Sequence, residues 1–565
     1  MRDPRRSALR ALTFGALTVG AVLAGDAARA QPTKPLASPP AKPGPKPTGA
    51  PTPSETPDAG APTPKPLLGL STRPTAIAGA PPEAPKPPAD AAGRRAWLKT
   101  ELDAALAAPA LAKAKVGVYV IDADAGRPLY GHNETASLNA ASNVKLVTSA
   151  AALSLLGPEY RWRTTLSIAA AGNGAGVPPG GEIAGDLVVR GGGDPALSVE
   201  DLAAMVGDLA ALGVRKIHGA LVVDDRMFDA ATVPPAFDQK NESTASRAAT
   251  SAASLAGNVV AVTVIPAGAA GAPARITLEP ASPYFVVSGT VTTAADGPAS
   301  PDVETKDEGG ARTRVVVSGR VKLGSEPRTF FRRVVHPALF LGASLRQQLE
   351  KRGIIVDKPT RVGAVPPQGQ RVLSTHESPP LAVVVQDLNK RSVNFVAEQL
   401  VRTLGAEIVG RPGTFEKGLE AVGRFLTSAG IAKGSYQMTN GSGLYDSNRF
   451  TPAQITTVLR VASRDFRLSA EYLASLAVAG TDGTIAHRMS GTLAERYVRG
   501  KTGTLAGVSC LSGFAGSPGH APLIFSVLMN DVGNAAEARR VQDRVAELLV
   551  AYLEAEPPSE AARQP

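Results

Sequence analysis

The fold is decided by the stretch Ala140-Ala141-Ser142-Asn143-Val144-Lys145-Leu146-Val147-Thr148-Ser149. If this segment is helical, residues three apart share one face, so the Lys145 amine lies beside the Ser142 hydroxyl. A hydroxyl next to a neutral amine can lose its proton as it attacks a carbonyl, which makes Ser142 a candidate nucleophile. The sequence after Lys145 is apolar up to Gly157-Pro158. This predicts a buried helix with Ser142 near its exposed N-terminus, where the helix dipole favours negative charge.

A serine and a lysine at this spacing also occur in ordinary helices, so motifs elsewhere in the chain must decide whether this pair is catalytic. In Asn389-Lys390-Arg391-Ser392-Val393-Asn394, Ser392 supplies a hydroxyl that can pass a proton, and Asn394 an amide that can donate and accept. The residues Lys501-Thr502-Gly503-Thr504 enter an apolar strand. Their ammonium and hydroxyls suit a substrate carboxylate and a carbonyl that becomes an oxyanion, and glycine allows close backbone approach. Singly, these motifs could be a helix cap and a turn; together they favour one catalytic site.

Ser-x-x-Lys, Ser-x-Asn and Lys-Thr-Gly in this order are typical of penicillin-binding proteins and class A β-lactamases. The first two motifs are much further apart than in a minimal β-lactamase, and a Glu-x-x-Leu-Asn motif for water activation is absent from the sequence. The chain resembles the class C low-molecular-mass penicillin-binding proteins, the D-alanyl-D-alanine carboxypeptidase/endopeptidase family of the penicillin-binding protein 4 type. The resemblance runs from about Arg94 to Leu553 and includes Arg190-Gly-Gly-Gly-Asp-Pro-Ala-Leu197, Val223-Asp-Asp-Arg-Met-Phe228, Asn440-Gly-Ser-Gly-Leu444, Asn448-Arg-Phe-Thr-Pro452 and Ala479-Gly-Thr-Asp-Gly-Thr484.

This resemblance implies a multi-domain α/β fold. Its core is a penicillin-recognising serine transpeptidase/β-lactamase-like α/β sandwich, interrupted by nested β-rich domains. The expected parts are residues 93–160 and 380–557 for the transpeptidase-like catalytic domain, 161–250 and 330–379 for inserted domain II, 251–329 for inserted domain III, and 558–565 for a flexible tail.

The resemblance also implies a role for each motif. Ser142 is the acylated nucleophile and Lys145 its general base. Ser392 relays the proton to the leaving group, and Asn394 binds the peptide amide of the substrate. Lys145 must be neutral to act as a base, and partial burial together with the neighbouring Lys501 would both lower its pKa.

The resemblance likewise implies a binding site for the terminal carboxylate of the substrate. Lys501, Thr502 and Thr504 hold the terminal carboxylate of the substrate, with Gly503 between them. The backbone N–H groups of Ser142 and Thr504 form the oxyanion hole.

The expected function is that of a serine-type D-Ala-D-Ala carboxypeptidase, endopeptidase or both. It acts on peptidoglycan stem peptides through an acyl-enzyme on Ser142, and β-lactams inhibit it covalently. The two peptidase activities use one acyl-enzyme, so the sequence does not separate them. Two alternatives stay open: a β-lactamase or esterase of the same fold, and a catalytically silent wall-binding protein. The absent glutamate motif opposes the first, and the intact trio of motifs opposes the second.

The N-terminus has the pattern of a secretory signal: an arginine-rich start, an apolar run from about Ala11 to Gly25, and Ala28-Arg29-Ala30 before Gln31. A membrane anchor is the alternative, but the apolar run is short for a spanning helix. We therefore expect residues 1–30 to be a cleaved signal peptide, the mature form to have no transmembrane segment, and the protein to be periplasmic. Residues 31–92 are rich in Pro, Ala and Lys and are expected to form a disordered linker.

Charge and residue counts narrow the possible partners. The formal charge is +10, and removing the signal, which has five basic and two acidic residues, leaves +7. The chain has no basic run interleaved with aromatics, so nucleic acid is not expected as a partner. Its six histidines show no metal-binding spacing, so we expect neither a metal nor another cofactor. The single cysteine, Cys510, excludes an intrachain disulfide and is expected to pack in a strand.

Overall fold

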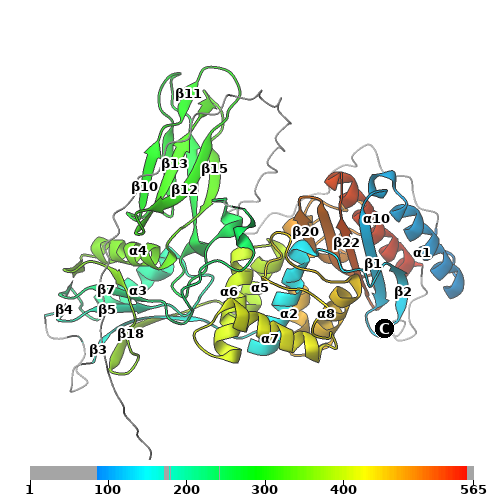
Figure 1. Ribbon diagram of the computed structural model, residues 1–565, viewed down its shortest axis with the longest axis horizontal. Coiled ribbons are helices and arrows are strands. Elements are labelled where there is room, and N and C mark those ends of the chain that lie inside the picture. The colour runs from blue at the N-terminus through cyan, green and yellow to red at the C-terminus, as the bar shows by residue number, and fades with distance from the viewer. Residues whose placement is uncertain (1–85, 171–176, 178–179, 241, 556–565) are drawn as a thin grey trace, which may run out of the picture. The chain divides into compact units, whose positions relative to one another are not determined.

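Residues 86–170, 177, 180–240 and 242–555 are described by the computed structural model. Within them, the first strand pairs with the last. β1 (Lys115–Asp122) and β22 (Leu523–Asn530) run antiparallel, with Lys115 opposite Asn530. They lie in a six-stranded sheet of order β19-β20-β21-β22-β1-β2 (Figure 1). Its other strands are β2 (Pro128–His132), β19 (Ala477–Val478), β20 (Val498–Leu505) and β21 (Val508–Ala515). One sheet is therefore assembled from both ends of the described chain.

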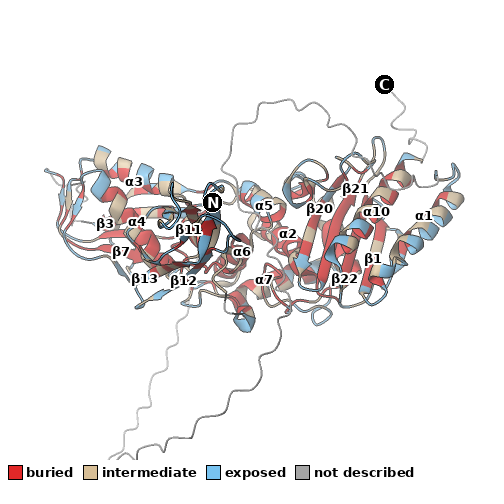
Figure 2. Cartoon of the chain, turned by 90° about the horizontal axis from the view of Figure 1, so that it is seen from above, coloured by how far each residue is buried: buried red, intermediate tan, exposed pale blue. Residues whose placement is uncertain are grey.

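Helices cover both faces of this sheet. Successive side chains of a strand point to opposite sides, so each strand packs against both helix layers. In β22, Leu528 packs into the hydrophobic cluster around α2 (Val144–Leu156). The neighbouring Val527 packs into the cluster formed with α1 (Ala91–Leu106) and α10 (Ala535–Glu554). The inner strands β21 and β22 are buried along nearly their whole length, whereas α1 and α10 each expose one side (Figure 2). This arrangement matches the predicted α/β sandwich.

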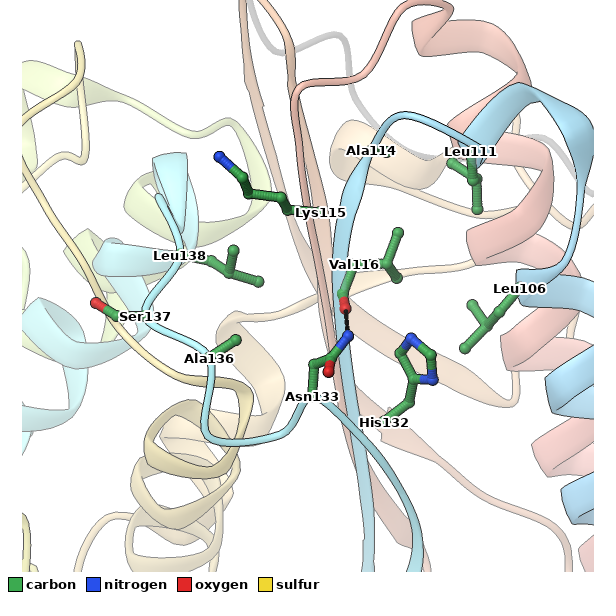
Figure 3. A pocket seen from close by; sticks show the side chains of 10 residues that line it. All are labelled: Leu106, Leu111, Ala114, Lys115, Val116, His132, Asn133, Ala136, Ser137 and Leu138. Carbon is green, nitrogen blue, oxygen red and sulfur yellow. Dashed lines mark hydrogen bonds between the residues drawn. The ribbon is translucent and has the colours of Figure 1, made fainter.

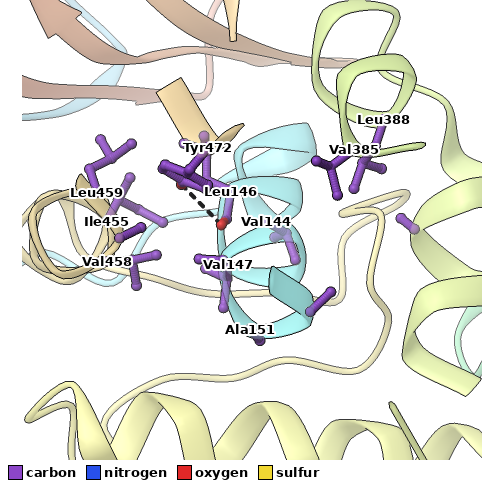
Figure 4. Close-up of a cluster of buried hydrophobic side chains, with 14 of the residues drawn as sticks. Val144, Leu146, Val147, Ala151, Val385, Leu388, Ile455, Val458, Leu459 and Tyr472 are labelled. Atoms are coloured by element: carbon purple, nitrogen blue, oxygen red, sulfur yellow. Dashed lines mark hydrogen bonds between the residues drawn. The ribbon is translucent and has the colours of Figure 1, made fainter. Parts of the chain in front are cut away.

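The α2 helix lies at the centre of the larger cluster (Figure 4). Every residue from Val144 to Leu153 is buried, as the apolar sequence predicts. Its neighbours are α5 (Leu381–Lys390), α6 (Asn394–Leu404), α7 (Phe415–Ser428), α8 (Pro452–Arg464) and α9 (Ser469–Ser475). The Tyr472 hydroxyl of α9 donates a hydrogen bond of 3.1 Å to the Leu146 carbonyl. Packing on several sides fixes α2, and with it the turn that carries Ser142.

The sequence between α2 and α5 forms separate sheets. A five-stranded sheet of order β17-β7-β5-β3-β18 and a parallel sheet of order β16-β6-β4 accompany α3 (Val199–Ala211) and α4 (Pro337–Lys351). Three more sheets have the orders β15-β8-β9, β10-β13-β12 and β11-β14. The strands are β3 (Arg163–Ala169), β4 (Glu182–Ile183), β5 (Leu187–Arg190), β6 (Lys216–Ile217), β7 (Leu221–Asp224), β8 (Val259–Ile265), β9 (Arg275–Glu279), β10 (Phe285–Gly289), β11 (Thr292–Ala294), β12 (Asp302–Glu308), β13 (Arg312–Ser318), β14 (Arg320–Lys322), β15 (Arg328–Arg333), β16 (Ile355–Val356), β17 (Arg361–Val362) and β18 (Gln370–Glu377).

We propose that the domains follow these sheets. The six-stranded sheet with its helices is the catalytic domain. The sheets that accompany α3 and α4 form inserted domain II, and the three further sheets form inserted domain III. The expected boundary after residue 329 falls inside β15, which pairs with β8 up to Arg333. We therefore place the end of inserted domain III at Arg333.

Two apolar runs inside the insertion, Ile183 to Arg190 and Val334 onward, predict strands, and the structure corrects both. The run from Ile183 to Arg190 is not one strand, because it breaks between β4 and β5. At this break the Asp186 carboxylate accepts a hydrogen bond of 2.7 Å from the Ala220 amide. The strand expected from Val334 onward instead ends at Arg333, and α4 begins at Pro337, whose fixed φ suits the first turn of a helix.

No helix in the described part of the chain is both long and apolar enough to cross a membrane. The predicted signal peptide, the whole of the predicted tail and most of the predicted linker lie outside the described residues.

Candidate active site

Ser142 lies in a short 3-10 turn, η2 (Ala141–Asn143), that leads directly into α2. The side chain of Lys145 points back to it, and its Nζ lies 2.9 Å from Ser142 Oγ. Ser142 is partly exposed, whereas Lys145 is 0% exposed. The three-residue spacing therefore places a reachable hydroxyl beside a lysine shielded from water.

Lys145 Nζ has two further acceptors. The Asn394 side-chain oxygen, at the start of α6 (Asn394–Leu404), lies at 2.6 Å, and the Ser442 backbone carbonyl lies at 2.7 Å. A neutral amine has two N–H donors and one lone pair. If the two donors bind these two oxygens, the lone pair is directed at Ser142 Oγ, which is the orientation that a general base needs.

The surroundings of Lys145 favour its neutral form. Burial lowers the pKa of Lys145 well below its usual value, and the positive charge of Lys501 lowers it further. The carboxylate of Glu398 acts in the opposite direction. Both causes expected from the sequence, burial and Lys501, are thus present.

Ser392 lies in the turn between α5 and α6, at a φ of +59° that residues other than glycine rarely adopt. Its Oγ accepts a hydrogen bond of 2.8 Å from Lys501 Nζ, which also donates to the Thr502 carbonyl at 2.8 Å. Burial lowers the pKa of Lys501 to about 7. The second and third motifs therefore meet, although more than a hundred residues separate them.

Both polar atoms of the Asn394 amide are engaged within the protein. Its oxygen accepts from Lys145, and its Nδ2 donates a hydrogen bond of 3.0 Å to the carbonyl of Ser246 in η4 (Ala245–Arg247). If Asn394 binds the substrate amide, Nδ2 must exchange the Ser246 carbonyl for a substrate carbonyl.

The third motif forms part of β20 and packs against the Ser142 turn. A Cβ atom on Gly503 would lie 3.1 Å from the Ser142 nitrogen and 2.9 Å from the Ala140 carbonyl oxygen, so a larger residue would push strand and turn apart. Thr502 Oγ1 lies 2.8 Å from Thr484 Oγ1, and Thr504 is exposed. This close approach brings together the two segments whose amides are predicted to form the oxyanion hole.

A family model, the D-Ala-D-Ala carboxypeptidase 3 (S13) family, matches residues 98–552. The chain belongs to the S13 family. This confirms the predicted resemblance and the enzyme class, a serine-type D-Ala-D-Ala carboxypeptidase. The D-alanyl-D-alanine carboxypeptidase of Actinomadura sp. (strain R39) is 35% identical over 502 residues, which are 86% of this chain and 90% of that protein.

Solved structures share the fold. The crystal structure of penicillin-binding protein 4 from Haemophilus influenzae matches with a TM-score of 0.68 and 24% identity, over 79% of this chain and 97% of that one. The same protein complexed with a β-lactam matches with a TM-score of 0.63 and 25% identity, over the same shares of both chains. These matches confirm the predicted fold class of this S13 chain.

Sequence reasoning gave no role to several residues that support the site. Asp482, within the quoted Ala479 to Thr484 motif, accepts a hydrogen bond of 2.6 Å from Lys390 at the end of α5, and so holds the Ser392 turn. Glu398 and Ser442 were not singled out for any role. Glu398 lies four residues after Asn394 on one helix, and this i, i+4 spacing was the available signal.

A cavity of about 460 Å³ opens beside the second motif of this S13 site. It is lined by Ser392 and Asn394, and by Ser246, Ala261 and Phe331 of the insertion. Another cavity of about 460 Å³ lies beside β1 and β2, where Asn133 Nδ2 donates to the Val116 carbonyl at 2.9 Å (Figure 3). None of the predicted site residues lines this other cavity.

Two further expectations concern metals and the cysteine. Over the part of the chain that the structure describes, no group of three or more His, Cys, Asp and Glu side chains is arranged to hold a metal ion. Cys510 is a buried residue of β21, as predicted, and burial raises the pKa of its thiol to about 12. It therefore remains protonated at neutral pH and is a poor nucleophile.

Proposed function

We propose that the chain hydrolyses the bond to the terminal D-alanine of peptidoglycan stem peptides through an acyl-enzyme on Ser142. One observation carries this proposal: Lys145 Nζ lies 2.9 Å from Ser142 Oγ, while two other acceptors fix its orientation. Family membership gives the reaction class, and this geometry supports Ser142 as the nucleophile and Lys145 as its base.

Acylation then proceeds in two steps. Ser142 Oγ forms a bond to the scissile carbonyl carbon as its proton passes to Lys145 Nζ, and the backbone N–H groups of Ser142 and Thr504 stabilise the oxyanion. Collapse of this intermediate breaks the C–N bond. The proton reaches the leaving nitrogen through Ser392, whose hydroxyl is free to donate because its oxygen already accepts from Lys501.

Deacylation uses the same groups. Water adds to the ester carbonyl as Lys145 accepts its proton, the C–O bond to Ser142 breaks, and the proton returns to Oγ. We further propose that Lys501, Thr502 and Thr504 bind the substrate carboxylate, that Asn394 binds its peptide amide, and that Gly503 permits the close approach of β20. A β-lactam offers a comparable carbonyl and carboxylate, so we propose that β-lactams acylate Ser142 as well.

The decisive assay measures the release of D-alanine from a pentapeptide ending in D-Ala-D-Ala, and of monomers from crosslinked muropeptides. We expect D-alanine release together with a penicillin adduct that outlasts many substrate turnovers. Rapid hydrolysis of penicillin with no D-alanine release would instead identify a β-lactamase. We also propose an extracytoplasmic location. Protein recovered outside the cytoplasm should begin at Gln31; recovery in the cytoplasm alone would contradict the location, and an intact Met1 on the exported protein would favour the membrane anchor over a cleaved signal.

The charge on Lys501 predicts the alkaline limb of the pH profile. Its pKa of about 7 means that it loses its proton, and its attraction for the substrate carboxylate, as the pH rises through 7. We expect kcat/KM for D-alanine release to fall over this range, because kcat/KM reports the free enzyme. Lys501→Arg keeps its charge and should lose this limb. A limb that is unchanged in Lys501→Arg would assign it to another group.

A further inference from the structure

Glu398 is a buried carboxylate that touches neither Ser142 nor the predicted carboxylate site. It lies on α6 with 1% of its surface exposed. One of its oxygens accepts the backbone N–H of Gly441 at 3.0 Å, and the other accepts that of Ser442 at 2.8 Å. A buried charge is costly unless hydrogen bonds satisfy it, and here a single short loop supplies both.

That loop, residues 440–443, is wedged between α6 and the nucleophile turn. A Cβ atom on Gly441 would lie 2.5 Å from Val401 Cγ2 on α6. A Cβ atom on Gly443, which has a φ of +78°, would lie 1.9 Å from the Ala141 carbonyl oxygen. Thr148 of α2 donates a hydrogen bond of 2.7 Å to the Gly441 carbonyl. The loop therefore has little freedom to move without disturbing its neighbours.

The loop also reaches the base. The Ser442 carbonyl accepts from Lys145 Nζ at 2.7 Å, and the Asn394 oxygen accepts at 2.6 Å. Asn394 and Glu398 are four residues apart and share one face of α6. One helix face thus sets both acceptors of Lys145, the first directly and the second through Glu398.

We propose that Glu398 is a positioning residue for acylation, which holds the Gly441 and Ser442 amides so that the Ser442 carbonyl orients the Lys145 amine toward Ser142. The inference rests on the proposed function, because it needs Lys145 to act as the base. If the Ser442 carbonyl moves, the amine loses one of two anchors and its lone pair is no longer held toward Oγ. This also gives a role to the Asn440-Gly-Ser-Gly-Leu444 motif.

Two variants of the mature protein separate the effect of the position of the 440–443 loop from the effect of the Glu398 charge. Glu398→Gln keeps the side-chain shape, but its NH2 group cannot accept from one of the two amides. Gly441→Ala leaves the charge intact and pushes the loop away from Val401. We expect both to slow acylation by a fluorescent penicillin about 100-fold at saturation, the effect of a small misplacement of a catalytic group, with unchanged affinity in the preceding non-covalent step.

The pH dependence of the acylation rate tests the role of Glu398 further, because a purely structural role would not change it. The charges that act on Lys145 are Lys501 from β20 and Glu398 from α6, and Glu398 raises the pKa of Lys145. Glu398→Gln should therefore shift the acid limb of acylation to lower pH, whereas Gly441→Ala should leave that limb in place. Glu547→Gln, the same change on α10 across the sheet, is the control and should match the wild type.

Wild-type acylation rates in Glu398→Gln or in Gly441→Ala would overturn the inference. So would equal losses of non-covalent binding and acylation in both variants, because that pattern indicates a misfolded site. These outcomes are distinct from failure of the proposed function, which would appear as labelling that survives in Ser142→Ala.

Discussion

Ser142→Ala is expected to abolish covalent labelling by a fluorescent penicillin and to lower D-alanine release by at least about 1,000-fold. The reason is geometric as well as chemical. Ser142 Oγ is the hydroxyl that Lys145 contacts, at 2.9 Å. The variant keeps the helix, the turn and the lysine, and it removes only the atom that forms the ester. Non-covalent binding of the penicillin should survive, because it does not need that atom.

Label incorporation followed by gel fluorescence and mass spectrometry measures this result. Ser149→Ala is a suitable control, since Ser149 lies on the same helix but its hydroxyl donates to the Lys145 carbonyl at 2.7 Å. The control should label at nearly the wild-type rate. Labelling of Ser142→Ala at that rate would sink the assignment of the nucleophile and, with it, the proposed mechanism.

Lys145→Arg should have the second largest effect, a fall in the acylation rate of about 1,000-fold. General base catalysis is typically worth 10²- to 10⁴-fold, and a guanidinium cannot be deprotonated in this pH range. The wild-type rate should rise with pH as Lys145 loses its proton. Because burial and Lys501 lower its pKa well below the usual value, this rise should occur well below pH 10. Lys145→Arg should lack it.

The measurement is the rate of acylation as a function of pH, in wild type and variant. Lys417→Arg on α7 (Phe415–Ser428) is the matched control, because its Nζ donates to the Gly410 and Pro412 carbonyls, which belong to none of the three motifs. A Lys145→Arg variant with the wild-type rate and pH profile would show that another group takes the proton of Ser142.

Side-chain motifs of the site were predictable from the sequence, whereas its backbone partners were not. Ser-x-x-Lys fixes a spacing along one helix, so the contact between Ser142 and Lys145 followed from local geometry. The Ser442 carbonyl left no such signal, because any residue type offers a backbone carbonyl. The contact between Asn394 and Ser246 depends on how an inserted segment returns to the catalytic domain, which periodicity does not report.

Elements of the fold were predictable where burial leaves a local apolar pattern, and were missed where a non-local contact determines them. Long apolar segments such as α2 and β22 were recognisable, because burial on one or both sides leaves a strong pattern. The break between β4 and β5 was missed, because the hydrogen bond between Asp186 and the Ala220 amide is non-local. Glu398 was missed because a single acidic residue in an amphipathic helix is usually a solvated one.

The pairing of β1 with β22 also determines when the enzyme can become active. The strand before Ser142 pairs with residues 523–530, so the sheet cannot close until the polypeptide has been synthesised as far as Asn530. Because β20 (Val498–Leu505) packs against the Ser142 turn, the proposed oxyanion hole also depends on a segment that is synthesised late. Closing such a distant contact is slow, and the insertion can fold first as a separate unit. We therefore expect a nascent chain that extends beyond Lys145 but not as far as Asn530 to have no peptidase activity.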